Sequence, residues 1–277
     1  MVEAYRAAGV LILRNFVARD ECLKLQGRAQ ELVAAFDPAV VRSIFSTTRQ
    51  TQLDDDYFIG SGDKIRFFLE NDAFDDAGNL KQAKEHSLNK MGHAMHDLDP
   101  VFDAFSRTPD LAEVARSIGF DDPVILQSMY IFKPPRIGGE VVCHQDSTYL
   151  YTEPESCVGF WFALEDATLE NGCMQFIPGG HKLPLKKRNY RKPDGKLVTE
   201  TLDDTPWPED RKVVAEAPAG TLVIFDGRTP HLSAANRSEV SRHAYTLHVI
   251  DRNCHYPAEN WLQRSAGLPL RGFDRES

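Results

Sequence analysis

GGEVVCHQD, residues 138–146, is the stretch on which the fold and the chemistry of this chain depend. It is a short apolar run that ends on His144 and Asp146, two positions apart. Side chains at positions i and i+2 of a β-strand point to the same face of the sheet. His144 and Asp146 are therefore predicted to reach one metal ion together. The pair alone is a weak signal, so its meaning depends on the sequence around it.

The sequence on both sides of this stretch alternates short apolar runs with turn residues. Six runs are bounded by Gly, Pro and Asp, and no helical pattern separates them. The runs are PVILQSMYIF (123–132), EVVCHQD (140–146), SCVGFWFALED (156–166), CMQFIPGG (173–180), GTLVIFDG (220–227) and HAYTLHVID (243–251). Strands at such spacing are typical of a β-sandwich or barrel. The polar residues 182–212 are predicted to form a long insertion.

The first third of the chain is predicted to be mainly helical, with a short strand in GVLILRNF (9–16). Asp20 is a candidate cap for a helix whose apolar stripe is Cys22, Leu25, Ala29, Leu32 and Phe36. Two further helices are predicted over 88–105 and 111–118, the second ended by Gly119. We expect one domain over residues 1–277. Its parts are a helical segment at about 1–122, a β core at about 123–252 and a tail at 253–277.

Composition and charge exclude several classes of protein. The 277 residues include 32 Lys or Arg and 41 Asp or Glu, which gives a net charge of −9. This acidic balance argues against a nucleic-acid surface, and no run reaches the roughly 18 apolar residues of a membrane span. Five cysteines without a CxxC pair are typical of free thiols in a reducing compartment. Because the N-terminus lacks a signal-peptide pattern, we expect a cytoplasmic protein. The charge and the short apolar runs predict that it has neither nucleic-acid nor membrane partners.

A third metal ligand is predicted at His231, in DGRTPHLSAANRS (226–238), directly after an apolar run. Two imidazoles and one carboxylate on one face of a metal form the facial triad of non-haem Fe(II) oxygenases. Such a triad leaves coordination positions open for a bidentate cosubstrate and dioxygen. The alternative is that His144 and Asp146 form a surface pair and that His231 is an ordinary loop residue.

Arg242 favours the metal-centre interpretation. On the run SRHAYTLHVID (241–251), Arg242, Ala244, Thr246 and His248 are predicted to share one face. An arginine inside a barrel is costly unless it meets an anion. A guanidinium fork binds a carboxylate through two parallel hydrogen bonds, so a dicarboxylate cosubstrate would supply that anion. The alternative is an exposed charge at a strand edge.

Long parts of the chain resemble the phytanoyl-CoA dioxygenase family of Fe(II)- and 2-oxoglutarate-dependent oxygenases. The similarity runs from about Gly9 to Leu270 and is weakest over the first fifty residues. The motifs that carry it are HQD (144–146), ENGCMQFIPGGHK (170–182), PHLSAANRSEVSR (230–242), SGDKIRFFLENDAFDDAGNL (61–80), NKMGHAMHDLDPVF (89–102) and QSMYIFKPP (127–135).

The resemblance implies a mainly β fold, with a double-stranded β-helix (jelly-roll) core and flanking N-terminal α-helices. It implies Fe(II) as the metal, 2-oxoglutarate as the cosubstrate and O2 as the second cosubstrate. Carried over by motif, the residues that would ligate iron are His144, Asp146 and His231.

The resemblance also implies a set of residues around the cosubstrate. Arg242 and Ser233 would bind the C5 carboxylate of 2-oxoglutarate. Lys90, Met129 and Trp161 match positions that line the cosubstrate pocket in this family. On their residue types alone, Lys90 also suits a solvated helix, and Met129 and Trp161 also suit a plain apolar core.

The activity expected from these residues is hydroxylation of an unactivated C–H bond in a small organic substrate, with 2-oxoglutarate converted to succinate and CO2. Halogenases of this fold lack the carboxylate ligand, so the presence of Asp146 favours an outcome other than halogenation. The same site can support desaturation, cyclisation or epimerisation. A further alternative is a non-catalytic metal-binding β-barrel that acts as a sensor or binding module. A binding module has no need of the dicarboxylate clamp at Arg242, which favours the enzyme.

Other candidates remain open at the level of sequence. His93 and His96 lie three apart on a predicted helix and could form a second metal pair, although an ordinary surface is the simpler interpretation. His248 is a candidate to point into the barrel. The basic run Lys182, Lys186, Lys187 and Arg188 could bind the phosphates of a CoA ester, against the simpler alternative of a solvated loop. The pocket walls are expected from residues 47–62 and 182–212.

Overall fold

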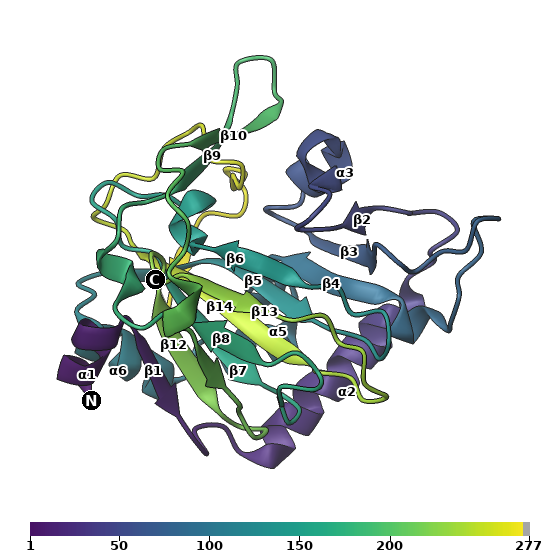
Figure 1. Ribbon diagram of the computed structural model, residues 1–277, viewed down its shortest axis with the longest axis horizontal. Helices are drawn as coiled ribbons and strands as arrows, with labels where there is room; N and C mark the ends of the chain where they lie inside the picture. Colours follow the sequence, from purple (N-terminus) through teal and green to yellow (C-terminus); the bar gives the residue numbers. More distant parts are fainter. Residues whose placement is uncertain (274–277) are drawn as a thin grey trace.

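The computed structural model describes residues 1–273 and contains two facing β-sheets with helices packed outside them (Figure 1). The main sheet has nine strands in the order β1-β12-β7-β14-β5-β4-β3-β2, with β15 also paired to β5. These strands are β1 (Val10–Leu13), β12 (Leu222–Asp226), β7 (Val158–Ala163), β14 (Ala244–Asp251), β5 (Pro123–Ile131), β4 (Leu88–His93), β3 (Ile65–Glu70), β2 (Ile44–Phe45) and β15 (Arg271–Gly272). The predicted mainly β, jelly-roll architecture is confirmed.

A second, four-stranded sheet faces the centre of the main sheet. Its order is β11-β8-β13-β6, and its strands are β11 (Val213–Ala215), β8 (Met174–Phe176), β13 (His231–Ser233) and β6 (Val141–His144). Met174 and Phe176 pack against Trp161 and Phe225 of the main sheet in one buried cluster. A separate hairpin, β9 (Lys187–Arg191) with β10 (Leu197–Thr201), projects from the rim (Figure 1). The expected insertion over 182–212 contains this hairpin.

The helices are concentrated in the first part of the chain. They are α1 (Val2–Ala8), α2 (Arg19–Ala35), α3 (Asp56–Ile59), α4 (Met95–Leu98), α5 (Pro100–Ser106) and α6 (Pro109–Ile118). Short 3-10 turns are η1 (Thr51–Asp54), η2 (Lys84–His86), η3 (Asp146–Thr148), η4 (Gly180–Lys182) and η5 (Glu209–Arg211). Within residues 1–273, none of the helices has the length and apolarity that crossing a bilayer requires.

The two faces of β14 show how the sheet separates core from cavity. Tyr245 and Leu247 point outward and are buried in the main core together with Leu25 of α2 and Phe102 of α5. Their neighbours Thr246 and His248 are also buried, but they point to the opposite, inner face and line a cavity. The main sheet is therefore covered by helices on one face and carries polar side chains on the other.

Two of the predicted helices are confirmed in position. In α2 the buried residues include Cys22, Leu25 and Ala29, as the stripe predicted. The predicted cap at Asp20 is wrong, because Ala18 occupies the N-cap position without a side-chain hydrogen bond. Asp20 lies in the first turn, where its negative charge suits the positive end of the helix dipole. Helix α6 ends as predicted at Gly119, whose φ of 115° lies in the left-handed region that favours glycine.

The predicted helix over 88–105 is wrong in its first third. Residues 88–93 form β4, which pairs with β3 on one side and β5 on the other. Leu88 and Met91 are three apart, a spacing typical of a helix, but a strand inside a sheet buries both faces and so loses simple alternation. The segment 1–122 was expected to be mainly helical, but it also contributes strands β1, β2, β3 and β4 to the main sheet. Strand β1, for example, pairs with β12.

A buried charge cluster ties the end of the chain to α4 and α5. The Asp97 side chain has no exposed surface and accepts hydrogen bonds from Arg107 (2.6 Å), Arg271 (2.8 Å) and Arg264. Burial alone raises the pKa of Asp97, but the adjacent His96, 3.1 Å away, and the guanidinium groups of Arg264 and Arg271 hold it well below its usual value. Asp97 is therefore ionised in the folded protein.

We expect Asp97→Asn to lower the free energy of unfolding by about 3–5 kcal/mol near neutral pH, because it removes the buried negative charge that offsets three guanidinium groups and leaves Asp103 as the acidic partner of Arg107 and Arg271. A carboxyl group with a lowered pKa contributes its stability above the pKa of the unfolded chain and loses it as pH falls toward the folded value. The difference between wild type and variant should therefore shrink in acid. Denaturant unfolding at several pH values measures both effects.

The matched control is Asp122→Asn, since Asp122 pairs with Arg252 where both side chains are 47% exposed. This change should cost less than about 1 kcal/mol. Equal losses for the two variants would mean that the Asp97 cluster does not stabilise the fold.

Candidate active site

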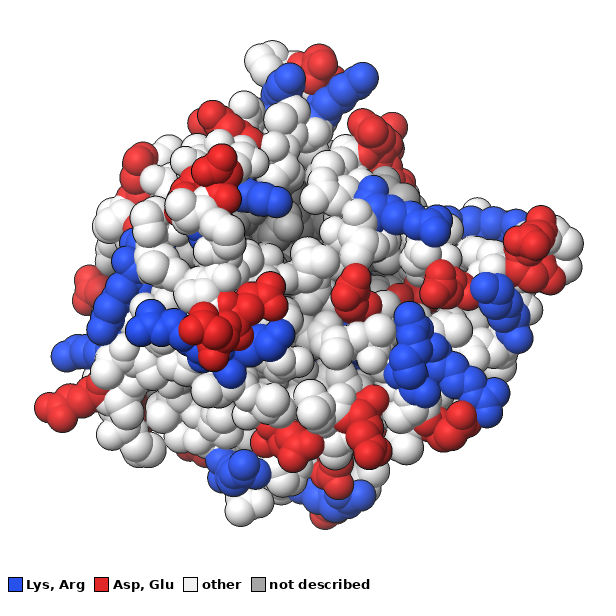
Figure 2. Space-filling view, viewed as in Figure 1, with Lys and Arg blue, Asp and Glu red and all other residues white. Residues whose placement is uncertain are grey.

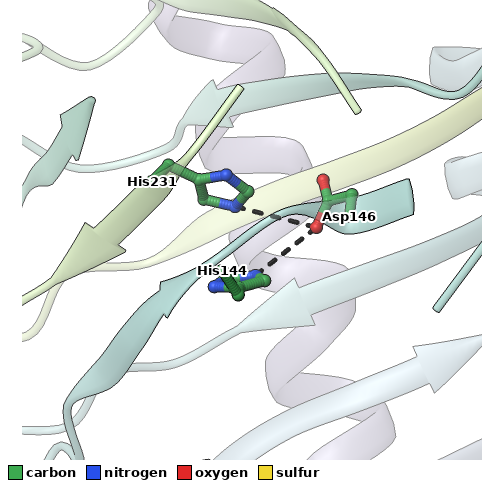
Figure 3. A group of neighbouring side chains, drawn as sticks. All are labelled: His144, Asp146 and His231. Atoms are coloured by element: carbon green, nitrogen blue, oxygen red, sulfur yellow. Dashed lines mark ion pairs between the residues drawn. The ribbon is translucent and has the colours of Figure 1, made fainter. Parts of the chain in front are cut away.

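Two histidines and one aspartate converge at the inner edge of the smaller sheet (Figure 3). Nε2 of His144 lies 3.4 Å from Oδ1 of Asp146, and Nε2 of His231 lies 3.7 Å from the same oxygen. One ligand atom from each residue lies within 4.8 Å of the other two. Within residues 1–273 this is the single group of three such side chains with metal-ligand spacing.

The backbone of two neighbouring strands sets this geometry. His144 at the end of β6 is the direct cross-strand partner of His231 at the start of β13. Asp146 follows β6 as the first residue of η3, and Gln145 between them keeps an extended backbone (φ −114°, ψ 133°). The expectation that His144 and Asp146 share a face therefore agrees with the structure. His231 lies on a short strand that the sequence pattern did not predict.

Hydrogen bonds to the backbone orient both imidazoles. Nδ1 of His144 lies 2.8 Å from the carbonyl oxygen of Val142, and Nδ1 of His231 lies 3.0 Å from that of Thr229. A carbonyl only accepts, so Nδ1 carries the proton in each ring and Nε2 keeps its lone pair. Such partners fix the tautomer of a metal-ligating histidine. Both lone pairs face Asp146.

The charges of the group also suit a cation. Burial raises the pKa of Asp146, but the adjacent His248 and His231 lower it well below its usual value, so the carboxylate is ionised. Burial and the neighbouring His144 lower the pKa of His231 to about 4, so this imidazole is neutral near pH 7. Neutral imidazoles and a carboxylate are the donor set of a non-haem Fe(II) site.

The triad opens onto a cavity of about 420 Å³ between the two sheets. All eight residues expected at the site line it: His144, Asp146, His231, Arg242, Ser233, Lys90, Met129 and Trp161. Figure 2 shows the surface hollowed between the β9–β10 hairpin and the region of α3. The structure thus brings together positions that lie up to 152 residues apart in the chain, from Lys90 to Arg242.

Arg242 is buried inside the protein without a counter-ion in direct contact. It is 1% exposed, and its Nε and Nη1 atoms have no hydrogen-bond partner among residues 1–273. Its guanidinium carbon lies 5.4 Å from the ring centroid of Trp161. Burial lowers the pKa of Arg242 to about 10, so the group remains charged near neutral pH. A buried charge with unpaired donors is costly, and a bound anion would satisfy it.

Three more side chains on the cavity wall support an anion at this place. Trp161 Nε1 and Thr246 Oγ1 are buried and have no hydrogen-bond partner within residues 1–273. Ser233 Oγ accepts from Nζ of Lys133 at 2.8 Å, so its own hydrogen is free to be donated. The unpaired donors near Arg242 therefore fit the carboxylate of a bound ligand, which would accept their hydrogen bonds.

Lys90 is the second cation on the cavity wall, on the side of β4. Its Nζ lies 3.2 Å from the ring centroid of Phe45 and 3.9 Å from Sδ of Met129. Burial lowers the pKa of Lys90 to about 7, against the opposing charges of Glu70 and Asp146. The structure therefore does not place Lys90 on a solvated helix, and Met129 is half-buried at the cavity rather than in the core.

Two cavity residues that sequence reasoning did not single out are Glu70 and Lys133. Glu70 is 1% exposed, its Oε1 has no partner among residues 1–273, and burial raises its pKa to about 7. Lys133 precedes two prolines and is 2% exposed. Each is a charged residue directly after an apolar run, and this placement is the one signal in the sequence that could have marked it as a buried cavity residue.

The opposite wall is aromatic. Phe58 and Trp261 stack with ring centroids 4.5 Å apart, and His93 packs edge-on against Trp261 at 5.1 Å. Phe58 comes from the stretch 47–62, which was expected to form a pocket wall. From the other expected stretch, 182–212, only Asn189 lines the cavity, whereas the tail supplies Trp261. The pocket wall therefore differs in part from the expectation.

The other residues considered from the sequence do not form the sites suggested for them. His93 and His96 are both buried, the first at the end of β4 and the second in α4, so neither the predicted shared helix nor the surface interpretation is correct. The cations of the basic run have separate partners within the protein. Lys186 donates to Asp203 at 2.8 Å, and Arg188 donates to Asn260 at 2.6 Å. None of its four cations lines the cavity. His248 does line it, as anticipated, and bonds to Asp146.

The chain is similar to known proteins over most of its length. A model of the phytanoyl-CoA dioxygenase (PhyH) family matches residues 5–244. The chain is 48% identical to "Phytanoyl-CoA dioxygenase 1" of Oryza sativa subsp. japonica over 264 residues, which cover 94% of this chain and 92% of that protein. It is 44% identical to "Phytanoyl-CoA dioxygenase domain-containing protein 1" of Mus musculus over 278 residues, which cover 97% of this chain and 96% of that protein.

A solved structure with the same fold is that of the non-haem α-ketoglutarate-dependent epimerase SnoN from nogalamycin biosynthesis. Its TM-score is 0.67 at 16% sequence identity, and the match covers 98% of this chain and 92% of that one. At this identity the likeness concerns the fold alone, while the family match and the relatives above carry the assignment. The chain belongs to the phytanoyl-CoA dioxygenase (PhyH) family and is a non-haem oxygenase that depends on iron and 2-oxoglutarate.

Proposed function

We propose that this enzyme hydroxylates an unactivated C–H bond of a small organic substrate and converts 2-oxoglutarate to succinate and CO2 in the same turnover. The observation that carries the proposal is the buried guanidinium of Arg242, with its Nε and Nη1 unpaired among residues 1–273, in the same cavity as the His144, Asp146 and His231 triad. A metal-binding module without turnover would leave this buried cation unexplained.

The proposed roles follow from the donor sets. His144 Nε2, Asp146 Oδ1 and His231 Nε2 would hold Fe(II). Arg242 and the hydroxyl of Ser233 would bind the C5 carboxylate of 2-oxoglutarate. When bound, the iron and 2-oxoglutarate supply the activation of O2, which no side chain can provide.

The remaining pocket residues would orient the cosubstrate and exclude water. Lys90 lies on the wall toward Asp146 and adds a positive charge beside a dianion. Trp161 offers a buried N–H to an oxygen of the ligand, and Met129 contacts Nζ of Lys90 through its Sδ at 3.9 Å. The aromatic wall formed by Phe58 and Trp261 closes the substrate side with apolar surface, which favours an apolar part of the primary substrate near the metal.

The test is a metabolite screen that reads out succinate under Fe(II), 2-oxoglutarate and O2, followed by mass analysis of any compound that raises the rate. The proposal predicts a product that has gained one oxygen atom. A product that has lost two hydrogens or changed configuration would instead assign desaturation, cyclisation or epimerisation to the site. Absence of succinate with and without every candidate would contradict the proposed turnover.

We expect the affinity for 2-oxoglutarate to fall as pH rises. Lys90 and Glu70 both titrate at about 7 in the free cavity. Lys90 loses its positive charge and Glu70 gains a negative charge in the same direction, so both changes weaken binding of a dianion. If binding needs the charged Lys90, the Kd should rise about tenfold between about pH 6 and about pH 8. Calorimetric titration of 2-oxoglutarate across this range measures the slope.

The variant that checks this slope is Lys90→Met, which should bind more weakly at low pH and show a flatter profile. Lys187→Met removes an exposed lysine outside the cavity and should keep the wild-type profile. A Kd that stays constant or falls with rising pH in the wild type would contradict a role for Lys90 in binding the cosubstrate.

The proposed setting is a reducing compartment such as the cytoplasm. All five cysteines are free, and three of them are buried. Free thiols persist where disulfides are kept reduced. On the face drawn in Figure 2, Lys and Arg are interspersed with Asp and Glu rather than gathered into a basic patch. This distribution supports a small-molecule substrate and argues against a nucleic-acid partner.

A further inference from the structure

We infer that His248, held by Gln127, is a positioning residue that fixes Asp146 as a metal ligand through one oxygen only. The inference rests on the proposed function, because it assigns a role to residues around the proposed metal centre. Nε2 of His248 lies 2.9 Å from Oδ2 of Asp146. The other carboxylate oxygen, Oδ1, is the one that faces both ligand histidines. The two oxygens of Asp146 therefore have different partners.

The direction of these hydrogen bonds is fixed by what each group can donate. The ionised carboxylate of Asp146 only accepts, so Nε2 of His248 carries the proton. Its Nδ1 then has a lone pair, which lies 2.9 Å from Nε2 of Gln127. The amide N–H₂ of Gln127 donates to it. Gln127 thus selects the tautomer of His248 that can donate to Asp146.

The surroundings make this relay rigid. His248 on β14 and Gln127 on β5 are direct cross-strand partners, so the sheet itself sets their spacing. They are 3% and 4% exposed, and both line the cavity. In a desolvated setting a hydrogen bond to a charged group is strong, and its loss is not compensated by water.

The consequence concerns the number of free positions at the metal. A carboxylate can bind an ion through one oxygen or through both. A donor held on Oδ2 disfavours the second contact and aims Oδ1 toward His144 and His231. One-oxygen binding preserves the open face that a bidentate cosubstrate and O2 need. His248 would therefore act through Asp146, without touching the metal.

The test measures binding of Co(II) alone, as a redox-stable probe, by calorimetry and by its visible absorption. His248→Phe fills the space but lacks the donor, and should raise the Kd for Co(II) about 10- to 100-fold. His248→Gln places an amide N–H₂ where Nε2 stood and should bind close to the wild type. His248→Asn is too short to reach Asp146 and should resemble His248→Phe. Gln127→Met should shift the Kd in the same direction by a smaller factor.

The absorption spectrum separates positioning from plain stability. A change in the coordination of Asp146 alters the Co(II) bands of His248→Phe at saturating metal, and His248→Gln should restore them. The control is His243→Gln, since His243 bonds to Tyr130 on the opposite side of the same segment and should leave both readouts unchanged. Melting curves without metal verify that each variant is folded, and if His248→Phe is not, the comparison of His248→Gln with His248→Asn decides.

The outcomes distinguish this inference from the proposed function. If the wild type binds Co(II), His144→Ala does not, and His248→Phe binds like the wild type with the same spectrum, the role of His248 is overturned and the metal centre stands. The same holds if His248→Gln loses as much affinity as His248→Phe. If His144→Ala binds as tightly as the wild type, the proposed metal centre itself is wrong.

Discussion

Asp146→Ala is expected to abolish succinate formation that depends on Fe(II), 2-oxoglutarate and O2. In the proposed metal centre Asp146 is the one anionic ligand, and its Oδ1 faces both His144 and His231. Losing an outer partner of a metal ligand costs about 10- to 100-fold, so losing the ligand itself should lower the rate by more than about a hundredfold. Succinate quantified against time at saturating Fe(II) measures the change.

The control for this variant is Asp122→Ala, which removes a half-exposed carboxylate that does not line the cavity and should keep the wild-type rate. Cobalt binding should be lost from Asp146→Ala and retained by the control. Equal turnover in Asp146→Ala and the wild type would show that the triad is not the metal centre.

Arg242→Ala is expected to raise the concentration of 2-oxoglutarate needed for half-maximal rate while metal binding is largely kept. Arg242 is fully buried, and its unpaired Nε and Nη1 are available to a ligand carboxylate. Truncating one partner of a buried charge pair costs about 2–5 kcal/mol, which corresponds to about 30-fold or more in affinity. Titration of 2-oxoglutarate into the Co(II)-loaded protein gives this change directly.

Two further variants sharpen the assignment of Arg242. Arg242→Lys keeps a charge but loses the planar fork, so its affinity should lie between those of the wild type and Arg242→Ala. Arg252→Ala removes a half-exposed arginine beyond the far end of β14 and should have no effect. The assignment would be wrong if Arg242→Ala lost Co(II) binding while the fraction that still binds metal kept the wild-type affinity for 2-oxoglutarate. Arg242 would then support the metal centre and not the cosubstrate.

The β core was predictable because its signals are local. Runs such as 220–227 and 243–251 contain a strand each, bounded by the Gly, Pro and Asp residues that end them. His144 and Asp146 share a face because strand geometry alternates with a period of two. The identity of His231 as their partner depended on resemblance and on its place after an apolar run, since its own three-residue strand is too short to give a pattern.

The errors have a common physical cause, which is burial on both faces. In β4, Leu88, Met91 and Lys90 are all buried, and each face of the strand meets a different environment. Neither helical nor strand periodicity then survives in the sequence. His93 and His96 were misplaced because a buried histidine carries no local mark of its surroundings: His93 lines the cavity, and His96 lies beside the buried carboxylate of Asp97.

Part of the site depends on contacts that only the fold creates. Gln127 and His248 are 121 residues apart, and their hydrogen bond exists because β5 and β14 are neighbours in the main sheet. Glu70 at the end of β3 and Lys133 after β5 likewise share the cavity wall, where each influences the pKa of the other. The overall charge of −9 was also a poor guide, since the cavity lining of an acidic protein includes the buried cations Arg242, Lys90 and Lys133 beside its acidic residues. Local charge, and not net charge, matches the cosubstrate.

The most direct measurement of the central claim is the fate of oxygen atoms when the enzyme turns over 2-oxoglutarate under ¹⁸O₂. The proposed reaction places one labelled atom in succinate, and mass spectrometry detects it even when no primary substrate has been identified. We predict labelled succinate from the wild type that requires Fe(II) and is absent from Asp146→Ala. Unlabelled succinate, or equal labelling in the wild type and Asp146→Ala, would contradict the proposal that this triad carries out 2-oxoglutarate-dependent oxygenation.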